Sequence, residues 1–395
     1  MNTWQSVKVA ELGRIVTGKT PKTAIPENYG GDIPFLTPSD DMSVKYVSKT
    51  AKTLTEKGLS EVKNTLLPPD AVCVSCIGSD LGKVVITTEK TVTNQQINSI
   101  IVDKDRFDVS FVYYAMLILG KELNFISKTS TAVPIVNKSS FSSYEIQCPS
   151  LDQQKRIAAI LSALDSKIEC NQKINDNLEQ QAQSYFQELF VDNADPEWTT
   201  GTISDLGAVV GGSTPSKAKP EYYTESGIAW ITPKDLSVNK SKFISHGEND
   251  ITELGLKNSS ASIMPEGTVL FSSRAPIGYI AIAAGEVTTN QGFKSVIPKS
   301  EIGTPFVYFF LKHNLPVIEG MASGSTFKEV SGSTMKNIPT VIPDAETLAR
   351  FNDFCAPIFA QQRILEEQSQ SLAALRDNLL PKLMSGEIDV SDIQL

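Results

Sequence analysis

The sequence predicts an α+β fold in which two similar strand-rich modules are separated by two long helices that pair as an antiparallel coiled coil. Three observations support this. The chain of 395 residues repeats itself, each copy is rich in short β-branched runs, and each copy leads into a long polar–apolar helical stretch. We expect the first module over residues 1–150, a central helix over 151–195, the second module over 196–343 and a C-terminal helix over 344–395.

The repeat consists of short strings that recur in the same order, beginning 194 positions apart. The pairs are Trp4 and Trp198; Leu12-Gly13 and Leu206-Gly207; Thr20-Pro21 and Thr214-Pro215; residues 33–40 and 228–235; Thr93-Asn94-Gln95 and Thr289-Asn290-Gln291; and Ser130-Thr131 and Ser325-Thr326. A period of this length indicates a duplicated domain, because solenoid repeats are only ~20–50 residues long. Two similar modules on one chain suit a ligand with two sites at a fixed separation.

Within the modules, β-branched runs bounded by Gly, Pro, Ser and Thr predict strands joined by tight turns. These runs are residues 71–75, 83–87 and 97–102 in the first module, and 268–272 and 279–283 in the second. Phe107–Leu119 and Pro305–Leu311 are richer in aromatic residues and predict one short buried helix in each module.

The stretch from Asp152 to Phe190 contains no Gly or Pro and has apolar positions every seven residues, which predicts a coiled-coil helix about 58 Å long. Its two tracks are Ile157, Leu164, Asn171, Leu178 and Tyr185, and Leu161, Ile168, Asn175, Ala182 and Leu189. The tracks of the C-terminal stretch are Phe351, Ile358, Leu365, Leu372 and Leu379, and Phe354, Gln361, Gln368 and Leu375. Pro381 and Gly386 are expected to stop that helix.

Polar residues interrupt the middle of both seams, namely Asn171 and Asn175 in one helix and Gln361 and Gln368 in the other. They could pair across an antiparallel hairpin and fix its register, or the seam could simply loosen there. An antiparallel pair of helices that each leave a module would place the modules at opposite ends of a pseudo-two-fold rod.

The net charge of −9 is concentrated in the helical stretches. Residues 1–150 and 198–343 carry net charges of +1 and 0, whereas residues 151–197 and 344–395 carry −5 each. The neutral modules could present a locally basic face to phosphate, and the acidic helices suit protein partners or solvation. No apolar run approaches the ~20 residues that span a bilayer, and the N-terminus lacks the order of a signal peptide, so we expect a cytoplasmic protein.

One string matches the phosphate-binding loop of nucleotide-binding proteins. Residues 13–20 fit the pattern G-x-x-x-x-G-K-[ST], in which Lys19 would neutralise phosphates and Thr20 would ligate magnesium. Two observations count against nucleotide binding. The second module has Ser213 in place of the lysine, and Pro21 follows at once where a helix should begin. Nucleotide binding remains an alternative function.

The sequence offers no other catalytic or metal-binding set. Cys73 and Cys76 have the spacing of half a zinc site, but no second pair lies nearby and the second module lacks them, so we expect buried thiols. His246 and His313 have no metal spacing and no counterparts in the first module. We therefore expect a non-catalytic chain that holds no metal and no cofactor.

The small polar and basic residues near the predicted turns are the candidates for ligand contact. They are Thr20, Lys22, Thr37, Ser39, Ser75, Asn94, Gln95, Ser130, Thr131 and Lys138 in the first module, and Thr214, Lys217, Thr232, Lys234, Ser273, Arg274, Asn290, Gln291, Ser325, Thr326 and Lys328 in the second. Hydroxyls suit phosphate oxygens, Asn and Gln suit the N6/N7 edge of adenine, and Arg274 suits guanine. Ordinary turn chemistry is the alternative explanation for each residue taken singly.

The whole plan resembles the DNA-specificity (S) subunits of type I restriction–modification systems. The strings that carry the resemblance are the module openings at residues 12–21 and 206–215, residues 153–165 and 178–182 in the central helix, and residues 379–387 near the C-terminus. The resemblance extends over essentially the whole chain. It is most specific in the helices and weaker inside the modules.

The resemblance implies that each module is a target-recognition domain that reads one half of a bipartite site in double-stranded DNA. It implies that the helices set the gap between half-sites and dock two methyltransferase (modification) subunits, which carry S-adenosylmethionine and methylate adenine. A restriction subunit that hydrolyses ATP is an optional further partner. A coiled-coil scaffold whose modules bind protein is an alternative function. Residues 75–80 and 272–276 differ between the modules, so a base contact in one is not transferred to the other.

Overall fold

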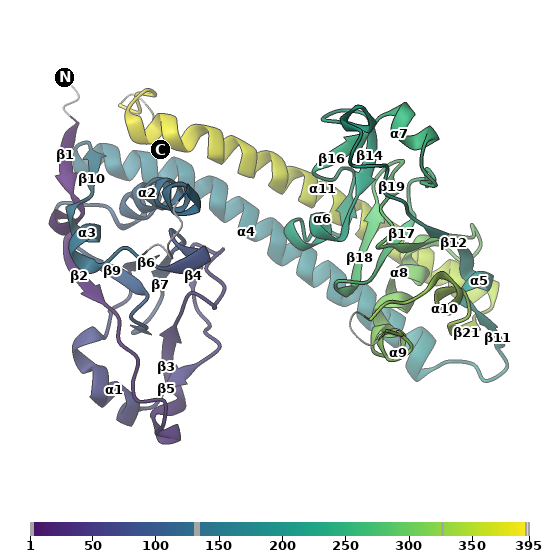
Figure 1. The fold of residues 1–395 in the computed structure, drawn as a ribbon. Helices are drawn as coiled ribbons and strands as arrows, with labels where there is room; N and C mark the ends of the chain where they lie inside the picture. The colour runs from purple at the N-terminus through teal and green to yellow at the C-terminus, as the bar shows by residue number, and fades with distance from the viewer. Residues whose placement is uncertain (1–3, 130–134, 325–327, 392, 394–395) are drawn as a thin grey trace. The chain divides into compact units, whose positions relative to one another are not determined.

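The computed structural model describes residues 4–129, 135–324, 328–391 and 393. The chain divides into two compact units, of which unit 1 comprises Met1–Glu169 and Gln370–Leu395 and unit 2 comprises Cys170–Ser369. Each unit contains a strand-rich module together with portions of two long helices (Figure 1). The α+β fold predicted from the sequence is thereby confirmed.

The module of unit 1 is built mainly from short strands. Its elements are β1 (Gln5–Lys8), β2 (Gly13–Thr17), β3 (Tyr29–Leu36), β4 (Tyr46–Val47), β5 (Thr53–Leu54), α1 (Glu56–Val62), β6 (Ala71–Ser75), β7 (Val84–Thr87), β8 (Val92–Thr93), β9 (Ile97–Val102), α2 (Val109–Thr129), α3 (Lys138–Ser143) and β10 (Glu145–Cys148). The larger sheet has the order β2-β9-β6-β7-β4, a smaller one has the order β5-β3-β8, and β1 pairs with β10.

The module of unit 2 repeats this plan. Its elements are β11 (Thr199–Thr202), α5 (Ile203–Leu206), β12 (Gly207–Gly211), β13 (Tyr223–Thr224), β14 (Ile228–Ile231), α6 (Pro233–Val238), β15 (Phe243–Ile244), β16 (Asn249–Ile251), α7 (Glu253–Lys257), β17 (Val269–Ser273), β18 (Ile277–Ala283), β19 (Thr288–Thr289), β20 (Lys294–Pro298), α8 (Thr304–His313), α9 (Leu315–Gly320), α10 (Gly332–Lys336) and β21 (Pro339–Ile342). The sheet orders are β12-β20-β17-β18-β15 and β13-β16-β14-β19, and β11 pairs with β21.

The larger sheets of the two modules share one strand order, and the smaller sheets differ by one strand, because unit 2 has two strands, β13 and β14, where unit 1 has the single strand β3. In the larger sheet of each, the edge strand (β4 or β15) pairs parallel to its neighbour (β7 or β18), and the remaining pairs are antiparallel. In the smaller sheet, β3 and β14 each have one parallel partner, β8 and β19 respectively. A shared order with the same mixture of parallel and antiparallel pairs is what a duplicated domain produces.

One aromatic-rich helix packs on each larger sheet, as predicted. In unit 1, α2 contacts β6 and β7, and Figure 1 shows it on the side of the sheet that faces α4 (Leu151–Gln187). In unit 2, α8 contacts β17, β18 and β20. The expectation of a single short helix per module was wrong. Several further helices begin at a capping side chain, such as Thr55 or Ser331, which accepts a backbone N–H three residues on. Such a local signal escapes an analysis of hydrophobic periodicity.

The glycines of the apparent phosphate-binding pattern serve close packing instead. Residues 13–17 form β2, and no helix begins at Thr20. A Cβ atom on Gly18 would lie 2.1 Å from the carbonyl oxygen of Asn94, and one on Gly212 would lie 2.0 Å from that of Asn290. The pattern therefore marks a place where two backbone segments touch, and the nucleotide-binding alternative has no structural support.

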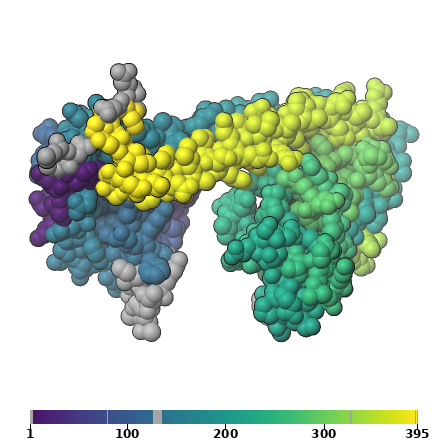
Figure 2. Space-filling model, turned by 90° about the horizontal axis from the view of Figure 1, so that it is seen from above, coloured from purple at the N-terminus to yellow at the C-terminus, as the bar shows by residue number. Residues whose placement is uncertain are grey.

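The two long helices pair antiparallel within each unit. In unit 1, Ile157 and Leu161 of α4 share a core with Leu380 and Leu383 of α11 (Ala345–Ser385). In unit 2, the later part of α4 shares a core with the earlier part of α11. Figure 2 shows the last turns of α11 (yellow) beside the N-terminal residues (purple), and a Cβ atom on Gly386 would lie 2.6 Å from Trp4 Nε1. The predicted helical pair is confirmed.

Two details of the helical prediction were wrong. Pro381 does not stop α11. The proline costs the helix one hydrogen bond, but the turn beyond it buries Leu383 and Met384, which offsets that cost. Gly386, with a φ of +78°, follows the last turn. The second track of α11 is also displaced by one residue. Phe354 is 40% exposed and Gln361 is exposed, whereas the next residue in each case is buried. The second track therefore lies four residues after the first, at Cys355 and Gln362, and not three residues after it as predicted.

The polar layers in the seam do pair across the helices. The Asn171 side-chain amide donates to Gln368 Oε1 at 2.9 Å and to Ser369 Oγ at 3.2 Å. Asn175 exchanges hydrogen bonds with the Gln362 backbone and side chain, at 3.4 and 3.2 Å. Of the two readings left open by the sequence, cross-helix pairing is confirmed, with Gln362 in place of the expected Gln361.

A lysine joins each module to the helices of its own unit, and it is buried in unit 2 and half-buried in unit 1. In unit 2, Lys242 lies just before β15. Its ammonium group lies 2.7 Å from the Glu179 carboxylate of α4 and 2.9 Å from Gln362 Oε1 of α11. In unit 1, Lys45 lies just before β4 and donates to Ser162 of α4 at 2.7 Å. Burial lowers the pKa of Lys45 to about 8, although nearby carboxylates favour its charged form. The equivalent position is thus used for the same purpose in both units.

Candidate nucleic-acid interface

Each module holds a threonine–glutamine pair between two neighbouring turns. The Thr20 hydroxyl donates to Gln95 Oε1 at 2.7 Å, and Thr214 makes the equivalent hydrogen bond to Gln291. The threonines follow β2 and β12, and the glutamines follow β8 and β19. All four residues are among the candidate contacts predicted from the sequence, and the structure brings together partners that lie 75 and 77 positions apart.

A second shared feature is a threonine–aspartate turn. Thr37 donates its backbone N–H and its hydroxyl to Asp40, at 2.7 and 2.8 Å, and Thr232 does the same to Asp235, at 2.7 and 2.6 Å. The other oxygen of each carboxylate accepts a further backbone N–H, at 2.6 Å for Asp40 and 2.8 Å for Asp235. These contacts commit the threonine hydroxyls to holding the turn, which is the turn chemistry that the sequence left as an alternative.

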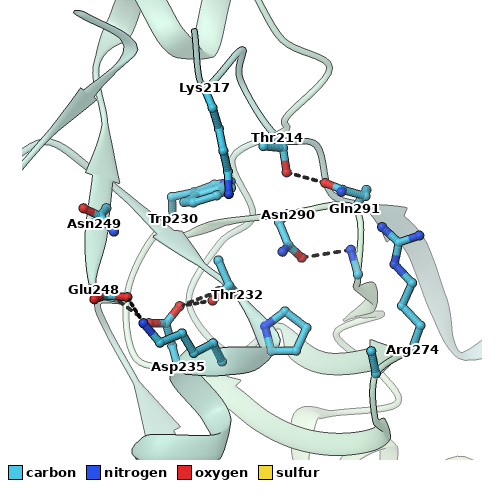
Figure 3. Close-up of a pocket in the computed structure, with 14 residues that line it drawn as sticks. Thr214, Lys217, Trp230, Thr232, Asp235, Glu248, Asn249, Arg274, Asn290 and Gln291 are labelled. Atoms are coloured by element: carbon cyan, nitrogen blue, oxygen red, sulfur yellow. Dashed lines mark hydrogen bonds and ion pairs between the residues drawn. The ribbon is translucent and has the colours of Figure 1, made fainter. Parts of the chain in front are cut away.

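In unit 2 these turns enclose an open cavity of about 490 Å³. The predicted residues that line it are Thr214, Lys217, Thr232, Lys234, Arg274, Asn290 and Gln291. Figure 3 shows Lys217 extending toward the indole of Trp230, and Arg274 on the opposite side near Gln291. Five strands and turns far apart in the sequence thus contribute to one concave surface.

The sequence missed several residues of this cavity, chiefly Trp230, Glu248 and Asn249. Trp230 lies inside the repeated string at residues 228–235, so the repeat itself was the available signal. Its indole N–H donates to the Ser213 carbonyl at 3.0 Å, and its ring forms the cavity wall. Glu248 lies 2.6 Å from Lys234, and this contact raises the pKa of the lysine.

The module of unit 1 arranges its candidates differently. Lys22, Ser39, Gln95 and Lys138 are exposed and Thr20 is half-buried. Asn94 is only 8% exposed, and both ends of its side-chain amide bond Gln96, to the backbone N–H at 3.0 Å and to the side chain at 2.9 Å. We therefore leave Asn94 out of the contact surface.

Some predicted residues lie elsewhere. Ser75 and Ser273 are fully buried in β6 and β17, and Ser273 donates to the Gly292 carbonyl at 3.0 Å, so burial removes both from the contact surface. Lys328 is exposed but does not line the cavity. Ser130, Thr131, Ser325 and Thr326 lie outside the described residues.

The structure also places the two cysteines that have the spacing of half a zinc site. Cys73 and Cys76 are buried, and burial raises the pKa of both thiols, which makes them unreactive. Within the described ranges, no cluster of three or more His, Cys, Asp or Glu side chains forms a metal site. None of the helices in those ranges combines the length and apolarity that crossing a membrane requires.

Comparison with known proteins places the chain in one family. It is 22% identical over 478 aligned positions to the type I restriction enzyme HindI specificity subunit of Haemophilus influenzae, with 98% of this chain and 100% of that protein covered. It is 40% identical over 191 residues to the MjaIX specificity subunit of Methanocaldococcus jannaschii, covering 46% of this chain and 44% of that protein. The fold resembles the crystal structure of the S subunit from M. genitalium, with a TM-score of 0.58, 18% identity and 97% and 96% of the two chains covered.

The family model described as the type I restriction modification DNA specificity domain matches this chain twice, over residues 1–180 and 196–382. The two matches account for most of the sequence and coincide with the internal repeat seen in the topology of the modules. The chain therefore belongs to the DNA-specificity subunits of type I restriction–modification systems.

Proposed function

We propose that this chain recognises a bipartite DNA target, with one module reading each half-site. The observation that supports this best is that the two modules share a backbone arrangement but carry different side chains at equivalent surface positions. The larger sheets of both modules have the same strand order and both modules have the same threonine–glutamine pair, yet Ser39 in one corresponds to Lys234 in the other, and Ile77 corresponds to Arg274. A common scaffold with different donors and acceptors suits two different base sequences.

The candidates that are exposed or half-buried, apart from the two threonines that hold the threonine–aspartate turns and from Asn94, form the proposed contact surface. In the first module they are Thr20, Lys22, Ser39, Gln95 and Lys138; in the second they are Thr214, Lys217, Lys234, Arg274, Asn290, Gln291 and Lys328. Lysine and threonine side chains would position the phosphate backbone, and the amide and guanidinium groups would read base edges. We retain residues 1–150 and 196–343 as the two recognition domains, and 151–195 and 344–395 as the spacer helices.

The helices are proposed to dock two methyltransferase subunits, and a restriction subunit where one exists. Their acidic excess, −5 in each helical stretch, makes them poor partners for DNA phosphates and suits a protein partner. Those subunits would carry S-adenosylmethionine and methylate adenine in the cytoplasm, so this chain would supply recognition without catalysis. The scaffold alternative, with modules that bind only protein, has no support from the family membership.

Methylation mapping tests the proposal directly. The chain is co-expressed with its cognate methyltransferase subunit in a host that lacks adenine methylation, and the genome is sequenced by a long-read method that detects methyladenine. We expect methylated adenines in two short half-sites separated by a fixed, unspecified gap. A continuous motif, or no methylation despite a purified complex of the subunits, would contradict the proposal.

DNA binding by the isolated chain is expected to be weak. The net charge of −9 repels DNA phosphates, and the few phosphate contacts of the two modules offset this repulsion only in part. The partner subunits would supply the remaining phosphate contacts. Fluorescence anisotropy with the mapped duplex should show at least ~10-fold tighter binding by the complex than by the chain alone, together with a steeper dependence of affinity on salt concentration. A duplex with a scrambled half-site is the control. Equally tight, sequence-specific binding by the isolated chain would contradict this prediction.

A further inference from the structure

We propose that Arg274 reads a guanine in the half-site of the second module, and that Glu329 positions the Arg274 side chain for this contact. The role presupposes the DNA-reading function proposed above and assigns a base to it. Arg274 is the sole arginine among residues 198–343, and it directly follows β17 at the edge of the 490 Å³ cavity.

The backbone around this pair is fixed by main-chain hydrogen bonds. The Val330 N–H donates to the Ser273 carbonyl at 3.0 Å, which ties the segment carrying Glu329 to the end of β17. Glu329 and Ser323 exchange backbone hydrogen bonds at 2.9 and 3.1 Å, and Val330 is fully buried. The Glu329 side chain therefore leaves a backbone that is held on both sides, next to the residue it contacts.

Glu329 holds two cations beside the cavity. Its carboxylate lies 3.5 Å from Arg274 Nη1 and 3.7 Å from Lys294 Nζ. Lys294 also donates to the backbone carbonyl oxygen of Gln291 at 3.3 Å. The Arg274 side chain remains 36% exposed. One edge of the guanidinium is thus anchored, while further N–H groups remain to face a ligand. Figure 3 shows the side chain extended along the cavity toward Gln291.

The other groups at this edge of the cavity are mostly donors as well. Asn290 Oδ1 already accepts the Gly292 N–H at 2.8 Å, and Gln291 Oε1 accepts the Thr214 hydroxyl, so the side-chain NH₂ groups are the donors that remain for a ligand. Adenine would require an acceptor for its N6 group, and Asn290 Oδ1 and Gln291 Oε1 each already accept one hydrogen bond. Guanine presents two acceptors, O6 and N7, in the major groove, and a guanidinium can donate to both.

The module of unit 1 shows that this position can vary within the same frame. There the Val136 N–H donates to the Cys76 carbonyl at 2.9 Å, the counterpart of the Val330 contact. Ile77 and Ile135 then occupy the positions of Arg274 and Glu329, and they form a backbone bridge with each other. An apolar pair in one module and a charged pair in the other, on one backbone arrangement, is the pattern of residues that determine specificity.

The test uses the complete complex of the chain with its methyltransferase subunits, and duplexes that carry the mapped target. Each guanine of the target is replaced in turn by 7-deazaguanine, which lacks the N7 acceptor, and binding is measured at equilibrium. We expect one guanine, in one half-site only, whose replacement weakens binding by about 5-fold or more, since a bidentate pair discriminates by roughly 5- to 150-fold. With Arg274→Ala, the same replacement should no longer change the affinity.

Further variants separate recognition from folding. Arg274→Lys keeps the charge without the two-pronged geometry and should reduce the sensitivity to that guanine. In the wild-type background, Glu329→Gln should partly reduce the sensitivity of binding to that guanine. Combined with Arg274→Ala, it should have no further effect. A purely structural role of Glu329 would not produce this dependence on Arg274. Lys299→Ala, a change of an exposed cation outside the cavity, should leave the sensitivity intact.

Each outcome decides the matter. A target whose second half-site contains no N7-sensitive guanine, or one whose sensitivity survives both Arg274→Ala and Arg274→Lys, overturns the assignment of Arg274. If Arg274→Ala fails to fold, the 7-deazaguanine series with wild-type protein and with Arg274→Lys still gives the answer. A missing split motif in the wild type would instead contradict the proposed function itself, so the two failures are distinguishable.

Discussion

Replacing Glu179 with alanine is expected to destabilise unit 2 by about 3–5 kcal/mol, because it leaves a buried ammonium group without its counter-charge. Glu179 lies 2.7 Å from Lys242 and 2.6 Å from Lys312, and the Lys242 side chain is only 6% exposed. The Tyr308 hydroxyl also donates to Glu179, at 3.1 Å. Urea denaturation followed by tryptophan fluorescence would measure the loss, since Trp198 and Trp230 both lie in unit 2.

An exposed ion pair in the same module provides the matched control. Lys234 and Glu248 are also 2.6 Å apart, but their side chains are 68% and 61% exposed. Glu248→Ala should therefore cost less than about 1 kcal/mol. Combining Glu179→Leu with Lys242→Met should restore much of the lost stability, because the double variant no longer buries an unpaired charge. Equal losses for Glu179→Ala and Glu248→Ala would show that burial does not govern the Glu179 contact.

The same carboxylate should make the stability of unit 2 sensitive to acid. Burial alone would raise the pKa of Glu179, but the ammonium groups of Lys242 and Lys312 outweigh it and lower the pKa from 4.5 to about 2. A carboxylate with a depressed folded-state pKa stabilises the protein fully above its unfolded value. We therefore expect a contribution of about 3 kcal/mol to be lost as the pH falls from 4.5 toward 2. Glu179→Gln should flatten this part of the pH profile.

Gly212→Ala is expected to destabilise the same unit by about 3 kcal/mol or more, through overpacking against atoms that cannot move aside. The added Cβ would lie 2.0 Å from the Asn290 carbonyl oxygen and 2.3 Å from that of Thr289, both of them backbone atoms. The turn that carries Asn290 and Gln291 would have to shift, so affinity for the mapped DNA half-site should fall as well. Thermal or urea unfolding and equilibrium DNA binding measure the two effects.

The neighbouring glycine supplies the control. A Cβ on Gly211 would lie 3.9 Å from the Lys294 side chain, an ordinary van der Waals distance, so Gly211→Ala should change stability by less than about 0.5 kcal/mol. Similar effects of the two substitutions would mean that strand propensity, not the close backbone approach, requires glycine here. Gly18→Ala should reproduce the Gly212 result in the first module, because its Cβ would meet the Asn94 carbonyl at 2.1 Å.

Much of the fold could be predicted because its signals are local or periodic. The strands at residues 71–75 and 97–102 and the seam of α4 follow from β-branched runs and a seven-residue pattern. The second track of α11 could not be placed this way, since Phe354 and Cys355 are both apolar and differ by one position in a helix. Only tertiary packing selects Cys355, which is fully buried in the core of unit 2.

The site was predictable where the repeat pointed to it, and not where it depends on contacts between distant residues. Thr214, Asn290 and Gln291 were found because their strings occur twice. The Arg274–Glu329 contact joins residues 55 positions apart and has no charged equivalent in the first module, so nothing in the sequence linked them. Burial of Ser75 and Ser273 likewise depends on which strand lies at the centre of the sheet.

The main-chain contacts Val136–Cys76 and Val330–Ser273 bear on how such a protein can evolve. A hydrogen bond between two backbone groups does not use the neighbouring side chains. Substitutions at residues 77, 135, 274 and 329 are therefore expected to leave both main-chain contacts in place. Mutations there can accumulate without being removed for loss of stability. Lineages could thereby acquire new target sequences in single steps while every intermediate still folds.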